Sequence, residues 1–219
     1  MSAVIFTLST PLASWAESGV SYRPSDFVPT WSALVGLVGA AFGWPRGDER
    51  LVRFATEFAP AFEVVRTGDR LVDFQTIQSP GRAVFKNKAP RTRHQEVDVA
   101  KEQGKLHTTI TKREYVQDSV YKIALASLVE KPFIGMKDII DALASPVFPL
   151  YAGRRSCPLG HVAAELSDGD AVNEWLPNVT HWDTRLVCEI EPSLTRERRD
   201  LLVKSAEPRR FSIRTEAIR

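Results

Sequence analysis

The stretch FVPTWSALVGLVGAAFGW, which runs from Phe27 to Trp44, supplies the apolar segment around which the rest of the chain can be arranged. Thr30 or Ser32 can accept hydrogen bonds from the first free N–H groups of a helix, and Gly43 can end that helix. The apolar run inside this stretch has about twelve residues, which is too short to span a bilayer. The stretch therefore predicts a buried helix.

Three glycines make this predicted helix unusual. Gly36, Gly39 and Gly43 each cost about 1 kcal/mol relative to alanine inside a helix, so another interaction should offset them. A glycine lets a helix approach a neighbouring backbone closely because it has no side chain. We therefore expect the glycine-bearing side of the helix to lie close to a sheet or to a bound backbone.

Segments with strand and helix periodicity lie on both sides of this helix. A strand is expected at Ala3–Leu8, followed by a loop rich in Ser, Pro and Gly that reaches Pro29. The later elements are expected to be a short helix at Arg50–Phe58, strands at Ala61–Arg66, Arg70–Ile77 and Tyr115–Ser127, a helix at Met136–Leu143, and strands at Leu186–Ile190 and Phe211–Ile218.

The order of these elements predicts the fold class. Thr67-Gly68-Asp69 is a good turn sequence and predicts a hairpin between the strands on either side of it. Tyr121, Ile123 and Leu125 alternate and should share one face of their strand. Strand, helix, strand, strand, helix, strand is the order of a ferredoxin-like domain. We expect an α+β fold with an antiparallel sheet and helices on one face.

Length and composition favour a soluble intracellular protein. The 219 residues suit one large domain or one domain with a small appendage, and we divide the chain into 1–150 and 151–219. Met1–Leu8 lacks the features of a signal peptide, and no stretch is long enough to span a membrane. Cys157 and Cys188 give no disulfide framework, so we expect a reducing cytoplasm. Cys157 and His161 alone are too few ligands for zinc, so no metal is expected.

The stretch YAGRRSCP, from Tyr151 to Pro158, predicts an anion-binding turn. Gly153 can adopt backbone angles that other residues avoid, and Pro158 stops regular structure. Between them lie Arg154, Arg155 and a hydroxyl group, and guanidinium groups match phosphate oxygens in bidentate fashion. The alternative interpretation is an ordinary exposed basic turn.

The glycine-bearing helix and this turn, about 120 residues apart, resemble the family-five Cas protein of CRISPR surveillance complexes, a member of the RAMP superfamily. Ser14-Trp15, Asp73–Ile77 and Thr111–Asp118 match the same family in the same order, and the resemblance extends from residue 4 to about residue 160. The resemblance implies that this chain is the subunit that caps the 5′ handle of the guide RNA in type I Cascade assemblies. The chain is most similar to the subtype I-E member, in which a separate nuclease cuts the precursor.

The resemblance also implies partners and binding residues. The partners would be the guide RNA, the backbone Cas subunits and the large target-recognition subunit, with target DNA reached indirectly through the complex. Trp15 could stack on bases or pack in the core, whereas core packing is favoured for Trp31. The expected RNA-binding residues are Trp15, Arg23, Thr30, Ser32, Arg82, Lys86, Lys88, Arg91, Arg93, Lys112, Arg113, Tyr151, Arg154, Arg155 and Ser156.

The segment Ser79–Ile110 is basic and has few apolar residues. Nine Lys or Arg against three acids give Arg82–Arg113 a net charge of +6, in a chain whose net charge is only +2. From Leu194 to the end, eight basic residues against four acids give +4. The segment could be a solvated loop or a mobile hairpin that orders on RNA. The family resemblance implies the second, a thumb that folds over the guide.

Catalysis is the alternative function. His107, Lys112 and Tyr115 could cleave RNA without a metal, with one side chain taking the 2′-OH proton and a cation stabilising the phosphorane. The sequence Arg113-Glu114-Tyr115 after Lys112 looks more like the non-cleaving members of the family. Gly36-x-x-Gly39 does not follow a strand in a nucleotide-binding arrangement, so no cofactor is implied. We expect a binding subunit that is not an enzyme.

Overall fold

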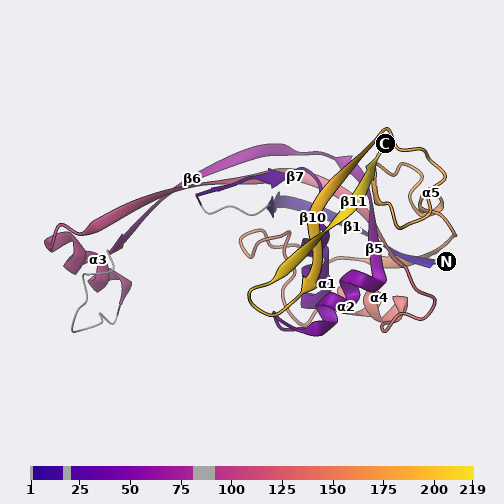
Figure 1. Ribbon diagram of the computed structural model, residues 1–219, viewed down its shortest axis with the longest axis horizontal. Helices are drawn as coiled ribbons and strands as arrows, with labels where there is room; N and C mark the ends of the chain where they lie inside the picture. Colours follow the sequence, from indigo (N-terminus) through magenta and orange to yellow (C-terminus); the bar gives the residue numbers. More distant parts are fainter. Residues whose placement is uncertain (1, 17–20, 81–91) are drawn as a thin grey trace.

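The computed structural model describes residues 2–16, 21–80 and 92–219 (Figure 1). A nine-stranded sheet has the order β10-β11-β9-β5-β7-β1-β8, and β3 and β6 also pair with β7. The strands are β1 Ser2–Ala13, β2 Trp15–Ala16, β3 Tyr22–Arg23, β4 Ser25–Asp26, β5 Phe58–Arg66, β6 Asp69–Pro80, β7 Leu106–Ser127, β8 Ala164–Asp168, β9 His181–Asp183, β10 Leu194–Lys204 and β11 Arg210–Ile218. The helices are α1 Trp31–Ala41, α2 Glu49–Glu57, α3 Arg93–Glu102, α4 Met136–Ala144 and α5 Val172–Trp175.

Four antiparallel strands, in the order β8-β1-β7-β5, form the middle of the sheet. Helices α1 and α2 connect β1 to β5, and α4 connects β7 to β8. Apart from the two-residue parallel pairing of β3 with β7, the pairings of the sheet are antiparallel. The predicted α+β class with an antiparallel sheet is confirmed.

Side-chain size distinguishes the two faces of this sheet. Phe62, Tyr121, Ile123 and Leu125 belong to the apolar cluster that contains the buried residues of α1, α2 and α4, so the predicted alternation along β7 is confirmed. Trp175 of α5 packs in a second cluster on the opposite face. The expectation that helices cover only one face was therefore wrong, because α5 covers the second face. The second face has room for a tryptophan because its strands contribute the small residues Ala3, Ala59, Ala61, Ala124 and Ala126.

Helix α1 begins and ends as its sequence predicts. Thr30 is the N-cap, and its side chain accepts a hydrogen bond from the N–H of Ala33. A Cβ added at Gly39 would lie 2.4 Å from Cδ2 of Leu51, so this glycine lets α2 approach α1. Gly36 is exposed, and a Cβ there would have no neighbour within 4 Å. The close approach at Gly39 is thus to a helix rather than to a sheet, and Gly36 faces open space.

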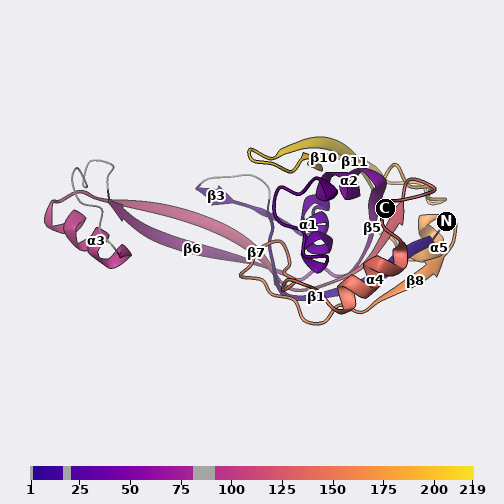
Figure 2. The same cartoon turned by 90° about the horizontal axis from the view of Figure 1, so that it is seen from below.

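An arm formed by β6 and the first half of β7 projects from the body and carries α3 at its tip (Figure 1, Figure 2). The predicted hairpin between Ala61–Arg66 and Arg70–Ile77 was wrong, because β5 and β6 both pair with β7, one after the other. The 22-residue length of β7 allows this arrangement. Asp118, with a φ of 56°, marks the change of partner along β7.

Outside residues 81–91, the segment Ser79–Ile110 is more regular than a solvated loop. It contains the ends of β6 and β7 and the helix α3, whose N-cap Thr92 accepts a hydrogen bond from the N–H of Gln95. Ala100 of α3 is fully buried. The role of this segment as an RNA-binding thumb stays a prediction. Four basic residues expected to contribute to it lie outside the described residues: Arg82, Lys86, Lys88 and Arg91.

The C-terminal third of the chain continues the same sheet. Strand β8 pairs with β1 and β9 pairs with β5, while the strand predicted at Phe211–Ile218 is confirmed as β11. The strand predicted at Leu186–Ile190 was wrong, because this segment is a loop whose residues Leu186, Cys188 and Ile190 pack on the alanine-rich face. The division of the chain into residues 1–150 and 151–219 stays a prediction. Within the described ranges, no helix has both the length and the apolar character needed to cross a membrane.

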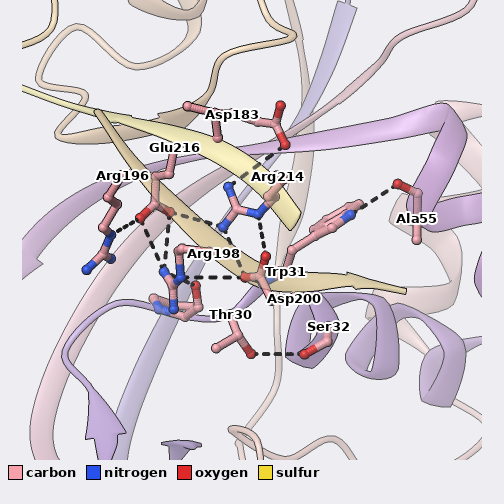
Figure 3. Close-up of polar contacts among 12 residues, drawn as sticks. Thr30, Trp31, Ser32, Ala55, Asp183, Arg196, Arg198, Asp200, Arg214 and Glu216 are labelled. Carbon is pink, nitrogen blue, oxygen red and sulfur yellow. Dashed lines mark hydrogen bonds and ion pairs between the residues drawn. The ribbon is translucent and has the colours of Figure 1, made fainter. Parts of the chain in front are cut away.

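A buried charge network joins the β10–β11 hairpin to α1 (Figure 3). Arg214 Nε donates to Asp200 Oδ1 at 2.7 Å and its Nη2 donates to Glu216 at 3.1 Å, while Arg198 lies 3.3 Å from Glu216. The other Asp200 oxygen accepts a 2.7 Å hydrogen bond from the N–H of Trp31, the first residue of α1. Burial alone would lower the pKa of Arg214, but the carboxylates outweigh burial and raise it, so the guanidinium stays charged.

Replacing Asp200 by alanine should destabilise the fold strongly. The change leaves two buried guanidinium groups short of a carboxylate and removes the acceptor of the Trp31 N–H, which we expect to lower the free energy of unfolding by about 3–5 kcal/mol. Urea denaturation measures this loss. The control is Glu197→Ala, which removes an exposed carboxylate from the same strand and should change stability by less than about 0.5 kcal/mol. Equal effects of the two substitutions would contradict a structural role for the network.

Candidate nucleic-acid interface

A groove of about 1330 Å³ lies between three elements of the body. The turn at Tyr151–Arg154 and Ser14 form one wall, the N-terminal half of α1 forms the second, and the β10–β11 hairpin forms the third. Figure 2 shows α1 between this hairpin and strands β1 and β7. Because the walls come from distant parts of the sequence, the groove exists only when the sheet is complete.

The turn after residue 150 is held tightly against the end of β1. Tyr151 and Pro158 form an isolated bridge, the Ala152 N–H donates to Cys157 O at 2.8 Å, and the Ser14 N–H donates to Ala152 O at 3.0 Å. Gly153 has a φ of +80°, and a Cβ there would lie 1.9 Å from the carbonyl oxygen of Ser14. Glycine is therefore required both for the backbone conformation and for the close contact.

The same turn offers free backbone donors. Among the described residues, no acceptor is found for the backbone N–H groups of Arg154, Arg155 and Ser156, which follow Gly153 directly. Successive N–H groups after a residue in the left-handed conformation can form a concave anion site. The turn can therefore bind an anion through backbone donors as well as through guanidinium groups.

The two adjacent arginines of the turn differ in direction. Arg154 lines the groove, its Nη1 donates to the Tyr115 hydroxyl at 3.0 Å, and its guanidinium carbon lies 5.7 Å from the centre of the Tyr115 ring. Arg155 and Ser156 are exposed and do not line the groove. Of the turn residues predicted to bind RNA, the structure thus brings Tyr151 and Arg154 into the groove.

Helix α1 contributes hydroxyl side chains to the groove, whereas the first backbone N–H of the helix is already hydrogen-bonded. Thr30 and Ser32 line the groove as predicted, and their hydroxyl oxygens lie 3.3 Å apart. A helix N-terminus can bind an anion through its free N–H groups, but here the Trp31 N–H already donates to the buried Asp200 carboxylate. That carboxylate neutralises the positive end of the helix dipole. Binding of an anion in this groove therefore depends on the arginines around it.

The third wall was missed as a site by the sequence analysis. Arginines outnumber acids in the groove lining by seven to two, which gives a local net charge of +5. Four of these arginines come from the β10–β11 hairpin, and Arg23, Arg46 and Arg154 complete the set. The net charge of +4 after Leu194 was the signal available in the sequence, but the sequence alone did not locate this charge in the groove. The hairpin arginines are Arg198, Arg199, Arg209 and Arg210.

Trp15, an expected RNA-binding residue, could either stack on bases or pack in the core, and the structure places it in the core. Its side chain is buried, with 1% of its surface exposed, and its indole N–H donates to the Tyr121 hydroxyl at 3.2 Å. Trp31 is also fully buried and stacks on Phe54, as its predicted core role requires. Neither indole offers a free face to a ligand.

Three further residues predicted to contact RNA, Arg93, Lys112 and Arg113, lie on the arm rather than in the groove. Arg93 pairs with Glu96 at 2.6 Å and donates to the carbonyl oxygen of Gln78 at 2.7 Å. Lys112 is exposed and Arg113 is half-buried on β7, beyond the groove lining. The groove and the arm are thus separate surfaces. Arg23, which was also predicted to contact RNA, lines the groove.

The alternative catalytic residues are not assembled into one site. His107 and Tyr115 lie eight residues apart on β7, which corresponds to about 27 Å along a strand. Lys112 points to the opposite face of the strand from both, because side chains alternate. Tyr115 is buried and holds Arg154. In the described part of the chain, no three His, Cys, Asp or Glu residues converge as a metal site.

Comparisons with known proteins agree on one family. The family model described as CRISPR-associated protein (Cas_Cas5) matches residues 3–215. The CRISPR system Cascade subunit CasD of Escherichia coli strain K12 is 29% identical over 164 residues, which cover 73% of this chain and 68% of that protein.

Solved structures show the same fold. A chain of a CRISPR RNA-guided surveillance complex is 25% identical, with a TM-score of 0.66 over 99% of this chain and 89% of that chain. The structure of a Cas protein is 20% identical, with a TM-score of 0.59 over 99% of this chain and 94% of that chain, and it supports the fold alone.

Gly153→Ala should disrupt the turn more than its backbone angle alone predicts. The left-handed conformation costs a non-glycine residue about 1–3 kcal/mol, and the Ser14 carbonyl adds a direct clash. Gly104→Ala is the control, since Gly104 has a φ of +62° but open space around it. We expect the Gly153 variant to lose more stability in thermal unfolding than the control. Equal losses would show that the Ser14 contact is not tight.

Proposed function

We propose that this chain, which belongs to the Cas_Cas5 family of CRISPR-associated proteins, is a non-catalytic guide-RNA-binding subunit of a type I CRISPR surveillance complex. In this role it caps the 5′ handle of the guide, as the subunit of a Cascade assembly used in antiviral DNA targeting. The observation that supports the binding role is the arginine-lined groove that contains Arg154.

The chemistry of the groove suits an RNA backbone. Guanidinium groups bind phosphate oxygens through paired, charge-assisted hydrogen bonds, and seven arginines line this surface. One of the seven, Arg198, is already paired with carboxylates of the buried charge network. At about 1330 Å³ the groove exceeds the usual 300–1,000 Å³ of a small-molecule pocket. Several nucleotides of an extended strand would fill it better than one small ligand.

The fold supports the partners proposed from the family resemblance. The order β8-β1-β7-β5, with helices between its strands, is that expected of a ferredoxin-like RAMP domain. The projecting arm would be the thumb that follows the guide toward the backbone subunits, and another surface would contact the large target-recognition subunit. Target DNA would be reached indirectly through the assembled complex, in the cytoplasm.

Arg154→Ala should weaken guide binding, whereas Arg155→Ala should not. Both variants lose one positive charge from adjacent positions, but Arg154 lines the groove and Arg155 does not. The loss of a charge-assisted contact of about 1.5–3 kcal/mol corresponds to a roughly 10- to 150-fold weaker affinity. Fluorescence anisotropy with labelled guide RNA from the same locus measures the difference. Equal affinity in both variants would contradict the role of the groove.

His107→Ala should leave guide maturation unchanged, because His107 is exposed on the arm and far from Tyr115. Loss of a general acid or base would slow cleavage by about 10²–10⁴-fold. The test is incubation of the purified protein with repeat RNA in EDTA, followed by gel analysis. A defined cut that His107→Ala abolishes would establish the endoribonuclease alternative and overturn the non-catalytic assignment.

A further inference from the structure

We infer that the β10–β11 hairpin is an RNA-binding element that holds unpaired nucleotides of the guide in the groove, an inference that rests on the proposed function. The hairpin faces the groove with three exposed arginines, Arg199, Arg209 and Arg210. It also presents Val203 and Ile213, whose side chains are 47% and 52% exposed. Basic and apolar side chains alternate here in the way that suits a strand of phosphates and bases.

The arginines of this hairpin fall into two groups. The first group is used by the fold: Arg196, Arg198 and Arg214 each pair with at least two carboxylates among Asp26, Asp183, Asp200 and Glu216. The second group consists of Arg199, Arg209 and Arg210, which line the groove and are not neutralised in this way. The ion pairs therefore distinguish the arginines that stabilise the fold from the arginines that are available to bind a ligand.

The contacts of the second group are few and weak. Arg199 Nε donates to the carbonyl oxygen of Phe211 at 3.4 Å, and Arg209 lies 3.6 Å from the exposed Glu207. Within the described ranges, Arg210 makes no ion pair. Exposed pairs contribute about 0–1 kcal/mol, so these guanidinium groups can exchange them for phosphate contacts at small cost.

The opposite wall leaves space for a chain of nucleotides. Ala33 and Gly36 of α1 face the hairpin across the groove, and a Cβ at Gly36 would have no neighbour within 4 Å. The Ser14 hydroxyl, buried in the same lining, has no hydrogen-bond partner among the described residues. A helix surface that carries only short side chains therefore faces a wall of guanidinium and apolar groups.

This combination favours a single strand over a duplex. Bases in a duplex are stacked and paired, so their faces cannot reach apolar side chains inside a groove, whereas splayed bases can. Val203 and Ile213 would contact base faces. Phe211 adds an aromatic ring to the same wall, and the guanidinium carbon of Arg209 lies 5.8 Å from the centre of this ring. The arginines would follow the phosphates.

The test compares Arg199→Gln with Arg210→Gln, as a double variant, against the control Lys131→Gln with Lys137→Gln. Both variants lose two exposed positive charges, but the lysines lie outside the groove. The probe is a 5′-labelled, mixed-sequence RNA of 12 nucleotides, alone or annealed to its complement, with binding followed by anisotropy at several KCl concentrations. Thermal unfolding verifies that each variant is folded.

We expect the hairpin variant to bind the single strand at least tenfold more weakly than wild type. The slope of log affinity against log salt should fall by about 1.4, since each phosphate contact contributes about 0.7 for a single strand. The control should lose less affinity, and the wild type should prefer the single strand to the duplex. Val203→Ser with Ile213→Thr should weaken binding without changing the slope.

Two further outcomes separate this inference from the proposed function. If Arg154→Ala weakens binding but the hairpin variants match their controls, the groove binds RNA and the hairpin does not. If wild type binds neither form of RNA, both proposals fail. Guide RNA carrying 4-thiouridine, crosslinked in the assembled complex, should label peptides from residues 199–213; labelling confined to other segments would overturn the inference.

Discussion

The position of the third wall of the groove depends on the contacts of the Asp200 carboxylate. This carboxylate accepts a hydrogen bond from Trp31 near the start of the chain and binds Arg214 near its end, so it fixes two distant segments at one point. Burying charges costs desolvation energy that the ion pairs repay only when every partner is in place. The network therefore stabilises one position of the β10–β11 hairpin relative to α1, rather than simply adding stability. A groove whose third wall is held by such a network has a defined width.

The parts of the fold that depend on local sequence could be predicted. The cap at Thr30, the end of α1 near Gly43 and the alternation of Tyr121, Ile123 and Leu125 follow from short-range rules and are present. The errors concern pairings over long distances. The turn at Gly68 has the sequence of a hairpin turn, yet β7 is long enough to pair with the strands on both sides of it. No local signal reports the length of a distant partner strand.

The candidate site was predictable to a similar extent. The turn at Arg154 was recognised from its composition, but sequence could not distinguish Arg154 from Arg155, because their directions depend on the backbone angle of Gly153 and on the distant Tyr115 hydroxyl. The basic excess after Leu194 was visible as charge without a location. Its position in the groove requires β9 to join β11 to β5, a pairing of a three-residue strand that has no recognisable pattern.

Strand β7 links the groove to the arm at two adjacent residues. The Tyr115 hydroxyl accepts a hydrogen bond from Arg154 in the groove, while the neighbouring Glu114 binds Arg70 of the arm, the Ser25 N–H and the Tyr22 hydroxyl. Burial alone would raise the pKa of Glu114, but the hydrogen bonds from Tyr22 and Ser25 and the charge of Arg70 outweigh burial and lower it. The carboxylate thus stays ionised near neutral pH and ties β3 and β6 to β7. A strand that holds one groove arginine on one face and the base of the arm on the other gives both surfaces a common rigid support, so the groove and the arm keep a fixed orientation relative to each other.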